Sequence, residues 1–142
     1  MGELETTVLP GTRVGGAYEI LRLLGRGGMG SVYLVRDLRA GDLVAFKTLR
    51  SARDPDDLAR FEREIRIMES LAHPRLVAFR DHGEWEGAPY FTMEYLRGRT
   101  LATWTDPGGP LPDEAGTWWA LRIAEGILEG LEYLHVENLI HR

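Results

Sequence analysis

The chain has 142 residues, which fits a single ordinary domain. Hydrophobic residues make up 44% and charged residues 27%, a balance that excludes a disordered tail or a coiled-coil rod. The net charge of −5 without a Lys/Arg cluster speaks against a nucleic-acid partner, and the absence of cysteine excludes disulfides and thiolate metal sites. No apolar run in the chain is long enough for a membrane segment.

The first elements in chain order are a lead-in and three strands. Residues 1–16 show no hydrophobic period, and we expect a flexible lead-in there. Each of the next three apolar runs is rich in β-branched or aromatic residues, which is typical of strands. The predicted strands are Tyr18–Leu24, Ser31–Val35 and Leu43–Leu49. A glycine-rich turn, Gly25–Gly30, joins the first two.

A helix and two more strands complete the first part. Asp54 suits an N-cap and Pro55 the first helical position. Apolar residues then recur at spacings of three and four, at Leu58, Phe61, Ile65, Met68 and Ala72, until His73-Pro74 stops the helix. Strands are predicted at Leu76–Phe79 and Tyr90–Met93, joined by a loop that carries Gly83 and Gly87. Hairpins dominate this part, so we expect an α+β fold with a five-stranded antiparallel sheet and one helix.

The second part is helical. A Pro/Gly-rich loop at Thr105–Pro112 precedes a long helix, expected from Asp113 or Glu114 to about His135. One face of that helix is apolar, with Ala120, Ile123, Ala124, Ile127, Leu131 and Leu134. Gly126 and Gly130 interrupt it, each at a cost of about 1 kcal/mol relative to Ala. Their spacing would allow a close backbone approach on one flank, which is one explanation among several.

The turn Gly25-Arg26-Gly27-Gly28-Met29-Gly30 matches G-x-G-x-x-G. Glycines let a backbone approach phosphate oxygens and offer N–H donors to them. The pattern alone also fits a dinucleotide-binding fold or a plain hairpin turn without a ligand. A dinucleotide site needs a helix after the third glycine and an acidic residue about 20 positions on. Here a strand follows, and Lys47 stands near that position. A P-loop is excluded because no Gly-Lys-Ser/Thr closes the glycine run.

Two charged residues are candidates for chemistry. Lys47 interrupts an otherwise apolar strand, and a buried ammonium requires an opposite charge or a polyanion. The alternative is a surface lysine on an edge strand. Glu64 lies on the flank of the apolar stripe of the first helix, near the expected sheet. Glu62 and Glu69 flank the other side, so helical geometry alone does not single out Glu64.

Taken together, the ordered motifs resemble a eukaryotic-type (Hanks-type) protein kinase, most of all the bacterial Ser/Thr kinases. The resemblance covers about Ala17 to Arg142, and six motifs in order at the family spacing make it specific. The matching segments are Leu24–Val32, Val44-Ala45-Phe46-Lys47, Arg60–Glu64, His73–Val77, Tyr90–Leu96, and Tyr133–His135 with Leu139–Arg142. Phe46 departs from the family's Val-Ala-Ile-Lys at a position without chemistry.

The resemblance implies a role for each site residue. Backbone N–H groups of the glycine loop, including Arg26, Met29 and Ser31, would cover the ATP phosphates. Lys47 would contact the α- and β-phosphates, held by Glu64. The adenine would lie against Leu24, Val32 and Ala45, hydrogen-bond to the Glu94 carbonyl and the Leu96 N–H, and meet Met93 as gatekeeper. No metal ligand is expected among the 142 residues.

The resemblance also sets the expected organisation: a flexible lead-in at 1–16, a kinase N-lobe at 17–93, a hinge at 94–99 and the start of a C-lobe at 100–142. The family's aspartate after His-Arg, and its magnesium ligands, would follow Arg142. We therefore expect a fragment of a Ser/Thr kinase that binds ATP and is inactive alone, with magnesium and a protein substrate as partners of the full-length enzyme. The alternative is a non-catalytic, pseudokinase-like nucleotide-binding or docking module. A cytoplasmic location is expected, and a later membrane anchor stays open.

Overall fold

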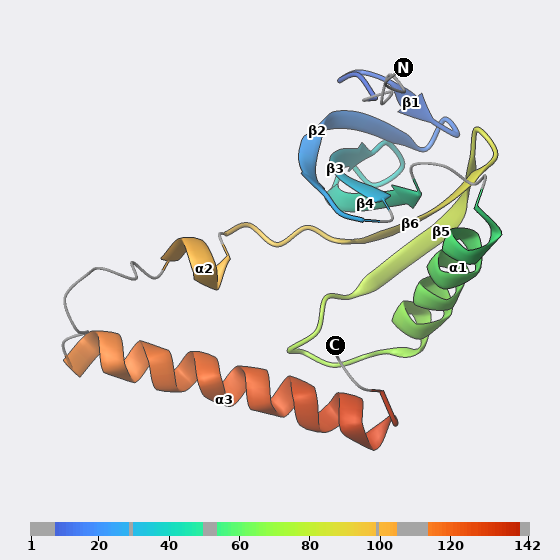
Figure 1. Cartoon of the computed structure of the whole chain (residues 1–142). Helices are drawn as coiled ribbons and strands as arrows, with labels where there is room; N and C mark the ends of the chain where they lie inside the picture. The colour runs from blue at the N-terminus through green and yellow to red at the C-terminus, as the bar shows by residue number, and fades with distance from the viewer. Residues whose placement is uncertain (1–7, 29, 50–53, 99, 105–113, 140–142) are drawn as a thin grey trace, which may run out of the picture. The chain divides into compact units, whose positions relative to one another are not determined.

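A computed structural model describes residues 8–28, 30–49, 54–98, 100–104 and 114–139. The chain divides into two compact units. The first holds the described residues up to Leu71 together with Ala78–Tyr95, and the second holds Ala72–Val77 and the residues from Leu96 onward. Figure 1 shows the elements of both units.

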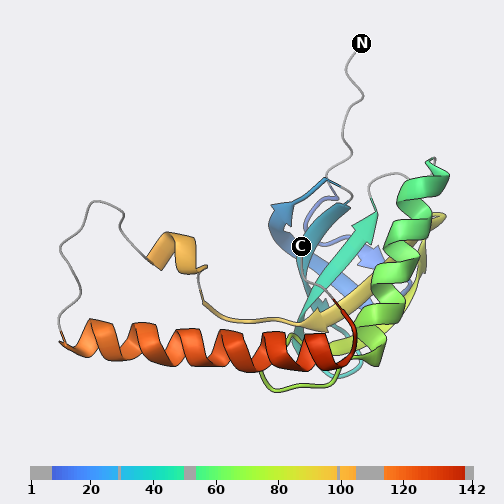
Figure 2. The ribbon, with the colours of Figure 1, turned by 60° about the horizontal axis from the view of Figure 1, so that its bottom comes forward.

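The first unit is one curled antiparallel sheet with a helix. Its described residues form six strands in the spatial order β1-β2-β3-β4-β6-β5. The strands are β1 (Arg13–Val14), β2 (Tyr18–Arg26), β3 (Gly30–Asp37), β4 (Leu43–Leu49), β5 (Phe79–Trp85) and β6 (Ala88–Glu94). The helix α1 (Pro55–Ser70) packs against β5 and β6 (Figure 2). The predicted α+β lobe is confirmed, and the short β1 adds a sixth strand to the expected five.

The expectation of a flexible lead-in is wrong for residues 13–16 and their neighbours. Val14 is fully buried and pairs with Tyr18 across a tight turn, in which Gly15 and Gly16 both have positive φ. The reason is that Val14 belongs to a buried apolar cluster whose other members come from β2, β3, β4 and β6. Residues 1–7 of the expected lead-in lie outside the described residues.

The helix α1 begins where the sequence predicts. The Asp54 side chain caps it by accepting a hydrogen bond of 2.9 Å from the Asp56 N–H, and Pro55 occupies the first helical position. Phe61 and Ile65 are its buried residues, so its apolar stripe faces the sheet. The Leu71 N–H donates to the Met68 carbonyl and closes the last turn.

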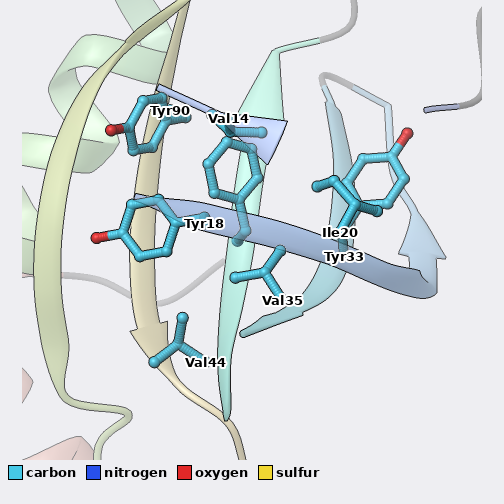
Figure 3. Close-up of a cluster of buried hydrophobic side chains, with 8 residues drawn as sticks. Val14, Tyr18, Ile20, Tyr33, Val35, Val44 and Tyr90 are labelled. Carbon is cyan, nitrogen blue, oxygen red and sulfur yellow. The ribbon is translucent and has the colours of Figure 1, made fainter. Parts of the chain in front are cut away.

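The sheet has an apolar core on the face away from α1. Figure 3 shows the cluster, in which side chains from β1, β2, β3, β4 and β6 interdigitate. Its buried members are Val14, Tyr18, Ile20, Tyr33, Val35, Val44, Phe46 and Tyr90. A second cluster on the α1 face joins Leu49, Phe61, Ile65 and Phe91. Because strand side chains alternate between faces, β4 sends Val44 and Phe46 to the first face and Ala45 and Lys47 to the other.

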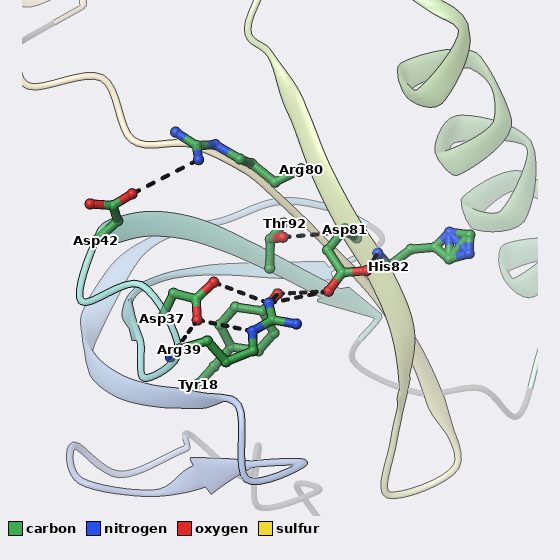
Figure 4. Close-up of polar contacts among 8 residues, drawn as sticks. All are labelled: Tyr18, Asp37, Arg39, Asp42, Arg80, Asp81, His82 and Thr92. Atoms are coloured by element: carbon green, nitrogen blue, oxygen red, sulfur yellow. Dashed lines mark hydrogen bonds and ion pairs between the residues drawn. The ribbon is translucent and has the colours of Figure 1, made fainter.

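A polar cluster ties β2, the β3–β4 turn and β5 together (Figure 4). Arg39 donates to the Tyr18 hydroxyl at 2.7 Å and to Asp37 Oδ2 at 3.0 Å. The Tyr18 hydroxyl in turn donates to Asp81 Oδ2 at 3.0 Å. Burial raises the pKa of the Tyr18 phenol, whereas the hydrogen bond from Arg39 lowers the pKa of Asp37. The cluster therefore satisfies the hydroxyl of a tyrosine that is otherwise enclosed by the apolar core.

The predicted strand at Leu76–Phe79 is wrong, because only Phe79 belongs to a strand. Leu76 instead closes a turn by donating its N–H to the His73 carbonyl, and its side chain lies against the long helix of the second unit. The expected loop residue Gly83 lies inside β5, where an added Cβ would come within 2.8 Å of the Tyr90 hydroxyl. Gly87 does lie in the β5–β6 turn, with φ of 76°.

The second unit is helical. It contains the short α2 (Leu101–Trp104), for which the sequence gives no signal, and the long α3 (Glu114–Val136), which begins and ends close to the predicted bounds. The expected loop residues 105–112 lie outside the described residues. Among the described residues, none of the helices is both long and apolar enough to cross a membrane.

Residues 72–77 lie along α3 within this unit. The Ala72 N–H donates to the Tyr133 hydroxyl at 3.2 Å, and the His73 ring stacks on the Tyr133 ring with centroids 4.9 Å apart. Arg75 forms an ion pair with Glu129 at 2.6 Å. The hydrogen bond from Arg75 lowers the pKa of Glu129. These contacts hold residues 72–77 in the second unit, and the chain rejoins the first unit at Ala78.

Candidate nucleotide-binding site

The register of three strands gathers the predicted site residues on one face of the sheet. Val32 on β3 lies opposite Lys47 on β4, and Ala45 on β4 lies opposite Met93 on β6. Directly opposed residues of antiparallel strands point to the same face. Val32, Ala45, Lys47 and Met93 therefore form one surface, on the side of the sheet that also carries α1.

Lys47 and Glu64 are in contact. The Lys47 Nζ lies 2.5 Å from Glu64 Oε1, across from the sheet to α1. The lysine side chain is 21% exposed and the glutamate 31%, so both have lost most of their water. Glu62 and Glu69 on the same helix are exposed. Helical geometry alone did not show which of the three glutamates pairs with Lys47. The structure shows that Glu64 is the one of the three that contacts the lysine.

One carboxylate oxygen of the Lys47–Glu64 pair lacks a hydrogen bond. Among the residues that the structure describes, Glu64 Oε2 is the buried side-chain oxygen without a hydrogen-bond donor. A buried acceptor without a partner costs about 1–3 kcal/mol. The position of Glu64 is therefore set by its contact with Lys47 and by the packing of α1, rather than by full hydrogen bonding of its carboxylate.

The glycine turn is shorter than the predicted Gly25–Gly30. Strand β2 continues through Arg26 and β3 begins at Gly30, and the Gly27 N–H donates to the Gly30 carbonyl at 2.9 Å. Added Cβ atoms at Gly25 and Gly28 would meet open space. The hairpin is thus exposed at Gly25, Gly27 and Gly28, where a phosphate group could approach the backbone, whereas Gly30 is buried. Met29 lies outside the described residues.

The other predicted residues fall into two groups. Leu24 and Val32 are half-buried near the base of the hairpin, and Ser31 is buried in β3. Glu94 ends β6, and its N–H donates to the Ala78 carbonyl at 2.9 Å. Leu96 belongs to the second unit, so the structure does not place it relative to the sheet.

Residues that could bind ATP are thus present, and the open glycine backbone and the Lys47 ammonium suit phosphate oxygens. In the described part of the chain, no group of three or more His, Asp or Glu side chains is arranged to hold a metal ion. Sequence reasoning missed Phe91, the residue directly opposite Lys47 on β6. Its only signal is the strand register, which a single sequence does not reveal.

A curled antiparallel lobe with one helix, followed along the chain by a helical unit, is the arrangement of a protein-kinase small lobe and the beginning of its large lobe. The protein kinase domain family matches residues 18–142. The chain belongs to the protein kinase family.

Its relatives are bacterial serine/threonine kinases. The chain is 45% identical to a probable serine/threonine-protein kinase of Streptomyces coelicolor over 136 residues, which cover 92% of the chain and 20% of the relative. It is 40% identical to the serine/threonine-protein kinase PrkC of Bacillus subtilis, covering 95% of the chain and 20% of PrkC. The chain thus spans about a fifth of the length of these curated relatives.

Solved structures agree with the fold. The kinase domain of Mycobacterium tuberculosis PknI matches with a TM-score of 0.70 and 29% identity, covering 96% of the chain and 54% of that domain. The apo form of PpkA-294 matches with a TM-score of 0.79 and 24% identity, a level at which the likeness shows the fold alone.

Proposed function

We propose that these residues form the ATP-binding part of a protein serine/threonine kinase, which in the longer protein transfers the ATP γ-phosphate to protein Ser/Thr. The observation that carries the proposal is the Lys47–Glu64 contact of 2.5 Å, on the same sheet face as Val32 and Ala45 and beside an open glycine hairpin. The names of the bacterial relatives support the Ser/Thr specificity.

In this proposal each group has one task. The ammonium of Lys47 neutralises α- and β-phosphate oxygens, and Glu64 holds that ammonium in place. Backbone N–H groups of Gly25–Gly30 approach the phosphates, including those of Arg26, Met29 and the adjoining Ser31. The small apolar side chains of Val32 and Ala45, with Leu24, contact the adenine.

The remaining adenine contacts come from the end of β6 and beyond it. The carbonyl of Glu94 and the N–H of Leu96 hydrogen-bond to the edge of the base, and Met93 limits the space behind it. Magnesium accompanies the ATP when the full-length enzyme binds it. Its ligands, like the aspartate that orients the substrate hydroxyl, belong in this family to residues beyond the His-Arg pair. A cytoplasmic location goes with this proposal, because ATP is the cytoplasmic phosphate donor.

Calorimetric titration of the 142-residue chain with ATP tests the binding half. We expect ATP binding by the parent chain, a loss of at least about tenfold in Lys47→Met, which corresponds to one charge-assisted contact, and a smaller loss in Glu64→Gln. Glu62→Gln is the matched control, because this exposed glutamate lies on the same helix and should leave affinity unchanged. Equal affinity of Lys47→Met and the parent chain would overturn the proposal.

Phosphoryl transfer separates the kinase from a non-catalytic nucleotide-binding module. The 142 residues should bind ATP without transferring phosphate. The protein extended beyond Arg142 should label a protein substrate at Ser or Thr, and Lys47→Met should remove that labelling. Binding without any transfer by the extended protein would favour the non-catalytic module.

A further inference from the structure

Phe91 on β6 lies beside the Lys47–Glu64 ion pair. It is the cross-strand partner of Lys47 in the β4–β6 register, so both side chains share the face that carries α1. The Lys47 Nζ lies 5.7 Å from the centroid of the Phe91 ring. The phenylalanine is 1% exposed, so no water competes at the ring.

This distance is within the range of a cation–π contact. The face of an aromatic ring carries negative potential and attracts an ammonium within about 6 Å of its centroid. The attraction is stronger when the ammonium has lost its water, as the lysine here largely has. Phe91 therefore offers Lys47 a second favourable contact besides the carboxylate of Glu64.

The ring is itself fixed by its neighbours. Phe61 on α1 packs against it with centroids 5.6 Å apart, and Phe79 on β5 stacks on it at 6.4 Å. Phe61 lies three residues before Glu64, on the same side of α1. Phe91 thus contacts the lysine directly and, through Phe61, the helical turn that carries the lysine's partner.

We propose that Phe91 is a positioning residue for Lys47. The face of the Phe91 ring holds the lysine ammonium at the point where phosphate is bound. The inference rests on the proposed ATP-binding function. The aromatic ring at position 91 thus interacts with the positive charge of Lys47, in addition to its packing between α1 and the sheet.

Fluorinated phenylalanines test this in the 142-residue chain. One, two and three fluorines on the ring of Phe91 remove its negative face stepwise while its size stays nearly the same. We expect the ATP dissociation constant to rise with each fluorine, to about two- to fivefold in the trifluoro form, which is the range of a partly exposed cation–π contact. The same series at Phe46, a buried phenylalanine in the cluster on the other face of the sheet, is the control and should leave the constant unchanged.

A second readout needs no ATP. The urea midpoint is measured for the Phe91 series in the parent chain and in Lys47→Met. We expect fluorination to lower the midpoint more when Lys47 is present, because the changed packing against Phe61 and Phe79 is common to both chains and cancels.

The outcomes separate the two proposals. If the parent chain binds ATP and Lys47→Met does not, but fluorination changes neither the dissociation constant nor the difference between the urea midpoints, the role of Phe91 is refuted and the ATP site stands. If the parent chain does not bind ATP, the proposed function fails, and the urea comparison alone decides whether the ring holds the lysine.

Discussion

At the scale of single residues, the glycines of the segment Gly25–Gly30 have different reasons to be glycine. Gly30 begins β3, where an added Cβ would lie 2.4 Å from the Thr48 carbonyl oxygen on β4. The conflict is with backbone, which a side-chain rotation cannot relieve. Gly25 lies in the same loop, yet its added Cβ would meet open space. Position 30 therefore requires glycine because of the close approach of β4. A requirement for glycine at position 25 would come from a ligand.

We accordingly expect Gly30→Ala to destabilise the chain by about 1–3 kcal/mol, the usual cost of forcing atoms into a packed site. Gly25→Ala should change the free energy of unfolding by less than about 0.5 kcal/mol, as exposed substitutions do. Urea unfolding of the two variants measures the difference. Similar stability of both variants would mean that the β3–β4 approach relaxes without cost.

The ion pair shows how much of the site the sequence predicts at this scale. A lysine inside an apolar strand and a glutamate flanking an apolar helical stripe were each ambiguous alone. The contact of 2.5 Å arises because α1 lies against β6 and β5, which directs Glu64 toward β4. Phe91 had no such local signal, because its importance depends on standing opposite Lys47 in another strand.

At the scale of elements, Gly126 and Gly130 in α3 lie against the segment 72–77. The Arg75 and Leu76 side chains lie over them, and an added Cβ would be 3.6 Å from Arg75 Nε at Gly126 and 3.5 Å from Arg75 Cβ at Gly130. Both are ordinary van der Waals distances. The close approach that the spacing suggests is thus present, but it leaves room for a methyl group.

Gly126→Ala should therefore stabilise α3, because alanine recovers about 1 kcal/mol of helix propensity without a clash. Circular dichroism during urea unfolding should show a higher midpoint for the helical signal. The Gly30→Ala variant is a control of opposite sign, in which the same chemical change lowers stability. A lower midpoint for Gly126→Ala would show that segment 72–77 packs on α3 more tightly than these distances allow.

Elements with a clear period or cap were predictable, and those set by remote contacts were not. The Asp54 cap and the stripe containing Phe61 and Ile65 located α1, and the spacing of apolar residues located α3. Strand β1 depends on burial of Val14 beneath residues distant in sequence. The apolar side chains of Leu76 and Val77 predict a strand, but the Leu76 side chain packs against α3 at Gly130, far along the chain.

At the scale of the whole molecule, the two units differ in how their apolar residues are covered. The first unit buries its large side chains in two clusters, one on each face of the sheet. The described part of α3 leaves six large apolar residues at least half exposed. They are Trp118, Trp119, Leu121, Ile127, Leu128 and Val136. The chain covers 54% of the PknI kinase domain that it matches.

This exposure predicts that the 142-residue chain associates with itself. Large apolar side chains exposed in this number on one helix favour association in water, because association removes them from the solvent. Sedimentation velocity over a range of protein concentrations should show species larger than the monomer, which has a mass of 16.0 kDa.

Exchanging exposed α3 residues for polar ones, as in Leu121→Gln with Leu128→Gln, should shift the distribution toward monomer. Substituting the exposed but polar Glu62 by Gln should leave it unchanged. A parent chain that sediments as a monomer at every concentration would contradict the prediction, and would mean that these side chains are covered in solution.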